Sequence, residues 1–288
     1  MPKSKVFVAL LAGAAALSLA ACSSSDETDG GLLGAIESGN VTLGVKFDQP
    51  GIGLREGDGS YTGAETEIAT KIVETLAEEN GWDAPNIQYR ETPAAQRETL
   101  LRNGETHLIQ GGYSITPDRM EIVDFAGPLL LTHQALLVRA DDDSIQSLED
   151  LDGKILCSTA GSKPAQRVKE EIPSVPLQEY DTNSSCIEAL SQGNVDALTS
   201  DAPILAGYAG QYDGKFEVLD MTKADGSFFS NEWYGIGLQK DDTESVDAVN
   251  QVLTDMKDSG ELDAIIEEYF GDLDSIEETT PGDLSEIE

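Results

Sequence analysis

The residues best suited to chemistry lie in one stretch, Gly111 to Pro128, which reads GGYSITPDRMEIVDFAGP. It follows a short apolar segment with the pattern of a buried strand. Two glycines at its start let other groups approach the backbone closely, because neither carries a Cβ. Ser114 then offers a hydroxyl, and the planar guanidinium of Arg119 can bind a carboxylate through two hydrogen bonds. The residues alone leave two interpretations for Arg119, a ligand clamp or an ordinary arginine on a surface helix.

Other kinds of site find no support in the sequence. No GxSxG nucleophile motif, Walker A loop, GxGxxG fingerprint, HExxH motif or CxxC pair occurs. The two histidines, His107 and His133, stand apart, and a lone histidine is more often structural than catalytic. We therefore expect no enzyme, no metal site and no bound cofactor.

The charge balance is unusual. The 288 residues include 18 Lys and Arg against 54 Asp and Glu, for a formal net charge of −36. A nucleic-acid binder needs a basic face, and an anionic membrane surface would repel such a chain. The composition is otherwise globular, with 39% hydrophobic residues, and the length suits one large domain or two lobes. The acid excess fits either a high-salt medium or simply an acidic secreted protein.

The first 22 residues have the pattern of an export signal. Lys3 and Lys5 precede an apolar run, Val6 to Ala20, that is too short for a comfortable transmembrane helix. The sequence LAAC at 19–22 resembles a bacterial lipobox, in which Cys22 is diacylated and becomes the new N-terminus; an ordinary secretory signal is the alternative. We expect a lipid-anchored protein on the extracytoplasmic face of the cell membrane, with residues 23–38 as a flexible tether.

Two further cysteines, Cys157 and Cys186, remain once Cys22 is assigned to the anchor. A leftover pair in an exported protein favours a disulfide. Closing a loop of that length contributes roughly 3–4 kcal/mol in the chain-entropy model. Two separate buried thiols are the alternative.

Strand and helix patterns alternate along the rest of the chain, which predicts an α/β fold with mostly parallel sheets. The expected strands are 41–47, 86–90, 108–111, 129–139, 154–157, 195–198 and 234–238. The expected helices are 66–80, 95–103, 148–153, 164–171, 185–192, 201–209, 246–259 and 262–270. The acidic segment after Gly271 holds little apolar mass and is expected to be loose.

The stretch at 111–128 resembles the signature of family 3 of the bacterial solute-binding proteins. That signature commonly has a small residue, Gly, x, Thr/Ser, Ile, Thr, x, Glu/Asp, Arg, then Asp-Phe-Ser-x-Pro; here it stands as GGYSITPDR and DFAGP. Further matches in the family's order are GAETEIA at 63–69, LDGK at 151–154 with AGS at 160–162, and GNVDA at 193–197. The departures, Ala64 for an aromatic and Ala126 for Ser, fall where residues support the fold. With the lipobox, the chain resembles the glutamate-type lipoproteins of this family.

The resemblance implies a two-lobed periplasmic-binding-protein-like (type II) fold with the ligand in the cleft. Two crossovers would join the lobes, near 129–133 and 230–234. Lobe 1 would combine 39–130 with 233–271, lobe 2 would be 131–232, and 272–288 would form an acidic tail. The protein is expected to be a monomer.

The resemblance also assigns roles to single residues. Arg119 would pair with the α-carboxylate of an amino acid, helped by Ser114 and the backbone at Gly112. Asp201, at the family's acidic position, would receive the α-ammonium group. These assignments describe recognition of an amino acid's two fixed charges.

The remaining candidate residues are expected to bind carboxylate oxygens of the ligand. Thr159 and Ser162 begin a helix whose free N–H groups could bind carboxylate oxygens. Lys46 and Arg97 match positions where members selective for acidic ligands carry a base. Two such bases in a chain poor in Lys and Arg argue for a second carboxylate, as in glutamate or aspartate. The alternative is that both are solvated or paired with surface acids.

The expected function is to bind a polar amino acid, foremost glutamate, by closing the lobes on it, and to dock on an ABC permease in the membrane. A receptor preferring glutamine and a sensor that reports its ligand remain alternatives. A third is an enzyme resembling cyclohexadienyl dehydratase on the same fold.

Overall fold

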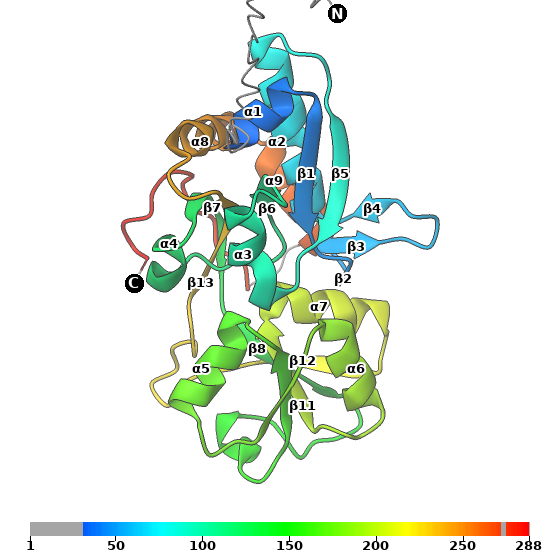
Figure 1. Cartoon of the computed structure of the whole chain (residues 1–288). Coiled ribbons are helices and arrows are strands. Elements are labelled where there is room, and N and C mark those ends of the chain that lie inside the picture. Colours follow the sequence, from blue (N-terminus) through cyan, green and yellow to red (C-terminus); the bar gives the residue numbers. More distant parts are fainter. Residues whose placement is uncertain (1–30, 272–274, 288) are drawn as a thin grey trace, which may run out of the picture.

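The computed structural model describes residues 31–271 and 275–287. Figure 1 shows two lobes, one above the other. The predicted signal peptide, the lipidation at Cys22 and residues 23–30 of the predicted tether lie outside the described residues. Within the described part of the chain, no helix is both long and apolar enough to cross a membrane.

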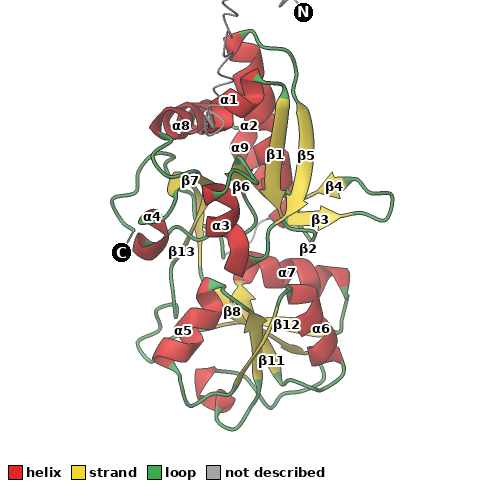
Figure 2. Cartoon of the chain, in the orientation of Figure 1, coloured by secondary structure: helices red, strands yellow, loops and turns green. Residues whose placement is uncertain are grey.

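Lobe 1, the upper lobe in Figures 1 and 2, is built on a five-stranded sheet in the order β5-β1-β6-β13-β7. Its strands are β1 (Asn40–Val45), β5 (Asn86–Glu91), β6 (Leu108–Ile109), β7 (Asp124–Thr132) and β13 (Glu232–Leu238). Its helices are α1 (Gly31–Glu37), α2 (Ala64–Asn80), η1 (Ala94–Gln96), α3 (Arg97–Arg102), α4 (Pro117–Met120), α8 (Thr243–Ser259) and α9 (Glu261–Phe270). A small sheet of β2 (Asp48–Gln49), β3 (Gly53–Arg55) and β4 (Tyr61–Thr62) projects from its side.

Lobe 2 repeats the plan with the order β10-β9-β11-β8-β12. Its strands are β8 (Gln134–Arg139), β9 (Leu156–Thr159), β10 (Leu177–Tyr180), β11 (Ala197–Asp201) and β12 (Phe216–Asp220). Its helices are η2 (Leu148–Leu151), α5 (Lys163–Glu171), α6 (Asn183–Ser191) and α7 (Ala202–Gln211). The chain enters this lobe between β7 and β8 and leaves it before β13.

Helical spacing of apolar residues accounts for the helices that cover the sheets. In α2, Ile68, Ile72, Val73 and Leu76 are buried, and the helix ends at Gly81, which adopts the left-handed conformation with φ 69°. The predicted α/β class with two lobes is confirmed. The prediction of mostly parallel sheets is wrong in detail.

Both sheets are mixed. In lobe 1, β1 pairs in parallel with β5 and β6, whereas β13 pairs antiparallel with β6 and β7. In lobe 2, β9 pairs in parallel with β10 and β11, whereas β8 pairs antiparallel with β11 and β12. The antiparallel strands include those that carry the chain from one lobe to the other. Such strands are not joined by the helical crossover that makes neighbouring strands parallel.

The predicted single strand at 129–139 is two strands that meet at His133. Thr132 pairs with Glu232 in the sheet of lobe 1, and Gln134 pairs with Asp201 in the sheet of lobe 2. A continuous apolar run does not reveal that its two halves belong to different sheets.

Two segments expected to be flexible are ordered parts of lobe 1. Residues 31–37 form α1, whose Leu32, Ala35 and Ile36 are fully buried, so the predicted tether is wrong for this part. The tail is not loose: Leu131 and Glu277 exchange backbone hydrogen bonds of 3.0 and 2.8 Å, along the outer edge of β7. Main-chain bonding to an edge strand leaves little mark on side-chain composition.

The predicted disulfide is confirmed. Cys157 on β9 and Cys186 on α6 are bonded with their Cα atoms 5.8 Å apart, and both are fully buried. The bond attaches α6 to the central part of the lobe 2 sheet.

Candidate ligand-binding site

A pocket lies between the lobes and is lined by residues of both. It is found at the carboxyl ends of β1 and β6 in lobe 1 and of β9 and β11 in lobe 2, where loops of α/β sheets commonly bind ligands. All eight residues singled out for the ligand from the sequence line it: Lys46, Arg97, Gly112, Ser114, Arg119, Thr159, Ser162 and Asp201. The structure thus brings together residues that lie as far apart in the chain as 46 and 201.

Arg119 is held in place by the chain around it. Thr116 caps α4 by accepting a hydrogen bond from the Arg119 backbone at 3.4 Å. The guanidinium donates to the carbonyl oxygen of Ser114 at 2.7 Å, lies 3.3 Å from Glu98 Oε1, and packs over the Tyr113 ring. The residue is 7% exposed and lines the pocket, so the surface interpretation of Arg119 is wrong.

Arg97 is more engaged than the sequence suggests. It is buried at the start of α3, and its guanidinium donates to the carbonyl oxygens of Thr92, Gly111 and Gly112 at 3.4, 2.6 and 3.2 Å. Like Arg119, it packs over the Tyr113 ring, with 4.9 Å between its Cζ atom and the ring centroid. Burial lowers the pKa of Arg97, and the nearby Arg119 lowers it further. Arg97 therefore supports the loop at Gly111 and Gly112, called the glycine loop below, and also lines the pocket.

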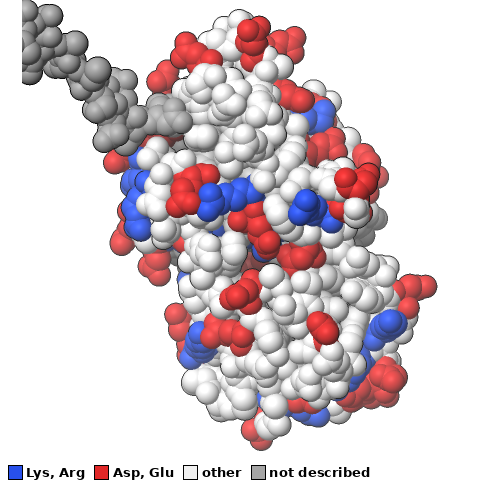
Figure 3. All heavy atoms as spheres, turned by 45° about the vertical axis from the view of Figure 1, so that its right-hand side comes forward, with Lys and Arg blue, Asp and Glu red and all other residues white. Residues whose placement is uncertain are grey.

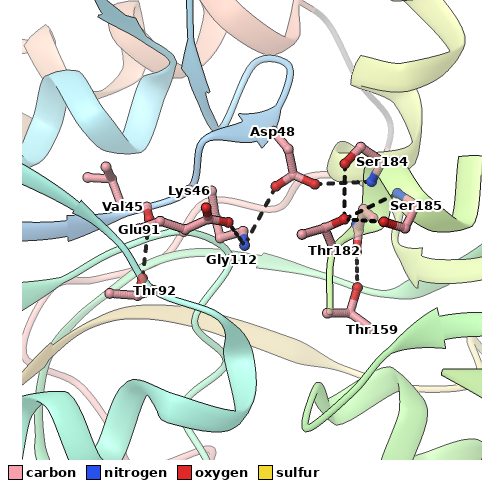
Figure 4. A network of polar contacts seen from close by, with 12 residues as sticks. Val45, Lys46, Asp48, Glu91, Thr92, Gly112, Thr159, Thr182, Ser184 and Ser185 are labelled. Carbon is pink, nitrogen blue, oxygen red and sulfur yellow. Dashed lines mark hydrogen bonds and ion pairs between the residues drawn. The ribbon is translucent and has the colours of Figure 1, made fainter. Parts of the chain in front are cut away.

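Lys46 also has protein partners. Its Nζ atom lies 3.3 Å from Glu91 Oε1 and 3.6 Å from Asp48 Oδ1, and the side chain is 2% exposed (Figure 4). The two acids offset much of the positive charge that Lys46 brings to the pocket.

Lobe 2 contributes hydroxyl and amide groups. Ser162 caps α5 by accepting from the backbone N–H of Ala165 at 3.1 Å. Thr159 donates to Asn183 Oδ1, and the amide of Asn183 donates to Ser200 at 3.3 Å. These side chains form one wall of the pocket.

Asp201 ends β11 and is 2% exposed. Its Oδ2 atom accepts from the Tyr234 hydroxyl at 2.7 Å, whereas its buried Oδ1 atom has no partner among the described residues. Burial raises the pKa of Asp201 to about 8, and the nearby Glu232 carboxylate adds to the rise. A buried acceptor without a donor is costly, so this oxygen is suited to a cationic or N–H group of a ligand.

Sequence reasoning missed several lining residues, of which Lys163 is the most informative. It opens α5, and its side chain makes no hydrogen bond or ion pair with any residue that the structure describes. Its only sequence signal is its place after the capping Ser162, which is weak. The other lining residues that were not predicted to bind the ligand are Gln49, Ala94, Gly111, Pro164, Asn183, Ser200 and Ile204.

The charge of the pocket contrasts with the surface. Among the described residues that line it, Lys46, Arg97, Arg119 and Lys163 are basic and only Asp201 is acidic. Figure 3 shows a face of the molecule with many acidic side chains on both lobes and along the constriction between them. No group of described residues has the composition and grouping of a metal site.

Comparisons with known proteins agree with this geometry. The model of the bacterial extracellular solute-binding proteins, family 3, matches residues 41–272. The glutamate-binding protein GluB of Corynebacterium efficiens is 57% identical over 265 residues, which cover 92% of this chain and 88% of that protein.

Solved structures share the fold. An ancestral arginine-binding protein bound to glutamine superposes with a TM-score of 0.71 at 29% identity, over 81% of this chain and 99% of that one. The ancestral amino-acid-binding protein AncCDT-1, a precursor of cyclohexadienyl dehydratase, gives 0.72 at 25% identity, over 83% and 99%. With its two lobes, its interlobe pocket and a family match across nearly all the described residues, the chain belongs to family 3 of the bacterial extracellular solute-binding proteins.

Proposed function

We propose that the protein is the substrate-binding component of an ABC importer and that its ligand is glutamate. The observation that carries the ligand assignment is the charge of the pocket: four basic side chains and one acid, in a chain with 18 basic and 54 acidic residues. Glutamate presents two carboxylates and one ammonium group. The similarity to a glutamate-binding protein at 57% identity supports the same ligand.

The proposed pose places each charged group of the ligand against a pocket residue of opposite charge. The α-carboxylate would lie against Arg119 and Ser114, beside Gly112; all three residues line the pocket from lobe 1. The N–H of Gly112 is already donated to Glu65, so Gly112 shapes this part of the pocket without binding the carboxylate. The α-ammonium would donate to the unpaired Oδ1 atom of Asp201. A charge-assisted hydrogen bond of this kind is stronger than a neutral one.

The second carboxylate would lie toward the other bases. Lys46 and Arg97 already contact protein oxygens, whereas Lys163 makes no such contact with the described residues. We therefore assign the main side-chain contact to Lys163, with Lys46 and Arg97 adding positive potential. Thr159 and Ser162, which precede α5, would lie beside this carboxylate at the start of the helix.

Closure of the lobes would couple binding to transport. The pocket takes residues from both lobes, so a ligand makes all its contacts only in the closed state and stabilises that state. The closed form would then dock on the permease and release the amino acid. No bond in the ligand is made or broken in this proposal, so the protein is not an enzyme. We further propose that a diacylated Cys22 anchors the mature protein to the outer face of the cell membrane.

Isothermal titration of residues 23–288, which lack the predicted signal peptide and the lipidated cysteine, tests the ligand with glutamate, aspartate, glutamine and arginine in low and in high salt. We expect micromolar or tighter binding of glutamate and weaker binding of glutamine. In Lys163→Gln, glutamate affinity should fall about tenfold, because a charge-assisted contact is lost, while glutamine affinity should change little.

The matched control is Lys169→Gln, which removes an exposed base from the same helix. Tighter binding of glutamine than of glutamate would contradict the proposed ligand. That result would fit the neutralisation of Lys46 by Asp48 and Glu91. If none of the four amino acids binds a folded sample, the proposal that the protein is a receptor for these amino acids is wrong.

A further inference from the structure

A buried carboxylate lies behind the glycine loop of the pocket. Glu65, near the start of α2, is 2% exposed. Its Oε2 atom accepts from the backbone N–H of Gly111 at 2.6 Å, and its Oε1 atom accepts from that of Gly112 at 2.9 Å. Glu65 does not line the pocket. One carboxylate thus holds two successive peptide N–H groups from outside the site.

The same two residues are held from their carbonyl side by Arg97, which donates to Gly111 O at 2.6 Å and to Gly112 O at 3.2 Å. Glu65 on α2 and Arg97 on α3 therefore fix all four polar backbone groups of this dipeptide.

The loop needs this support because of its conformation. Gly111 and Gly112 have φ values of 138° and 60°, which L side chains rarely adopt. A Cβ at Gly111 would lie 2.6 Å from Lys46 Cγ, so a side chain cannot be added to stiffen the loop. Free of restraint, glycines sample many orientations, and the peptides at the pocket wall would lose their alignment with Ser114 and Arg119.

We propose that Glu65 is a positioning residue, which orients the Gly111–Gly112 peptides and thereby sets the affinity of the pocket for the α-carboxylate of any amino acid. The inference rests on the proposed function, because it assumes that the pocket binds an amino acid. Glu65 acts through the backbone and does not touch the ligand. Selectivity among side chains is therefore independent of it.

Glu65 holds the two N–H groups best when its carboxyl group is ionised. Burial raises its pKa to about 6, while the hydrogen bonds from Gly112 and Gly111 and the charge of Arg97 oppose the rise. Lys46, which directly follows β1, packs on Gly111. The charge of Glu65 also contributes to the raised pKa of Tyr234 on β13. At neutral pH the carboxylate accepts both N–H groups, whereas a protonated acid would present a donor to one of them.

The test replaces Glu65 with glutamine, which has nearly the same shape but only one acceptor oxygen. We expect Glu65→Gln to weaken glutamate and glutamine binding by the same factor, about tenfold or more, since a buried charge-assisted hydrogen bond is lost. The ratio of the two affinities should stay as in the unchanged protein. Glu65→Asp, which keeps both acceptors on a shorter arm, should lose less.

A second readout is spectroscopic. In protein labelled with ¹⁵N-glycine, the amide protons of Gly111 and Gly112 should move upfield in Glu65→Gln, because a carboxylate acceptor has been replaced. Glu74→Gln, an exposed change on the same helix, is the matched control for removing one negative charge. If Glu65→Gln misfolds, Glu65→Asp carries both measurements.

Two results would overturn the inference. One is an affinity equal to that of the unchanged protein for each amino acid that it binds; the other is a pair of glycine amide signals that do not move. A change confined to glutamate would make Glu65 a selectivity residue and would also contradict it. Failure of glutamate to bind the unchanged protein, with another amino acid binding instead, refutes the proposed ligand but leaves this comparison intact.

Discussion

At the residue scale, Asp201 has the clearest chemical consequence. Its carboxyl is buried, one oxygen has no partner among the described residues, and Glu232 repels its charge. Burial raises the pKa of this carboxyl to about 8, which favours the protonated form of Asp201 at pH 7. An ammonium group beside it favours the charged form and so lowers this pKa. Binding must then release a proton.

We therefore expect glutamate affinity to rise as the pH increases from 6 toward 8, by up to about tenfold per pH unit, and to level off above the pKa of the empty site. Titration calorimetry at pH 7 in phosphate and in Tris, whose ionisation enthalpies differ, measures the proton released. Glu232→Gln should diminish the release, because it removes a repelling charge. Equal apparent enthalpies in the two buffers would contradict this account of Asp201.

The sequence predicted the pocket residues that belong to recognisable motifs. Arg119, Ser114 and Asp201 line the pocket as expected, although their roles toward the ligand stay predictions. Glu65 lies in a motif that was noticed, yet its role was invisible, because it depends on hydrogen bonds to the backbone of a loop 46 positions away. Lys163 was missed because a lysine in the first turn of a helix is normally solvated.

At the element scale, the disulfide joins the two elements of lobe 2 that carry part of the pocket wall. Cys186 on α6 is bonded to Cys157 on β9, and the same two elements carry Asn183 and Thr159, which are hydrogen-bonded at the pocket wall. The bond closes a loop of 29 positions within lobe 2.

Replacing both cysteines with serine should lower the free energy of unfolding by about 3–4 kcal/mol, because the unfolded chain regains the entropy of the open loop. Urea denaturation, followed with and without a reducing agent, measures the loss. The reducing agent should destabilise the original protein but leave the double variant unchanged. A loss below about 1 kcal/mol would show that the disulfide contributes little.

Elements with their own periodic pattern were predictable, and those that depend on partners were not. The helix at 64–80 repeats buried apolar residues and ends at a left-handed glycine, so its pattern is local. The tail at 275–287 is ordered by backbone pairing with β7 and by Leu284 and Ile287, which pack against the cluster around Leu100. Such order depends on an exposed sheet edge that no local pattern reveals.

At the scale of the whole molecule, the lobes touch through contacts beyond the pocket. Asp48 of lobe 1 accepts from the backbone N–H of Ser184 in lobe 2 at 3.0 Å (Figure 4). It also accepts from the hydroxyl of Tyr208 in lobe 2 at 3.2 Å. On the same side, Gly207 of α7 faces Pro50 so closely that a Cβ would lie 2.2 Å from the Pro50 carbonyl oxygen. The arrangement of the lobes in this structure therefore requires a residue without a side chain at position 207.

Gly207→Ala should raise the thermal stability of the protein but lower its affinity for glutamate. Alanine favours the helix over glycine by about 1 kcal/mol, so the unliganded protein should melt at a higher temperature. The added methyl group obstructs closure, and because the ligand draws its affinity from the closed state, glutamate should bind about tenfold or more weakly.

The matched control is Gly210→Ala in the same helix, where a Cβ meets no atom within 4 Å. It should gain the helix stability and keep the affinity, because position 210 is exposed and does not face lobe 1. Thermal melts without ligand and calorimetric titrations of both variants make the comparison. Small-angle scattering should show that glutamate compacts Gly210→Ala and not Gly207→Ala. If Gly207→Ala binds and compacts like the control, the contact between α7 and the Pro50 turn does not belong to the ligand-bound state, and binding is completed with the lobes further apart.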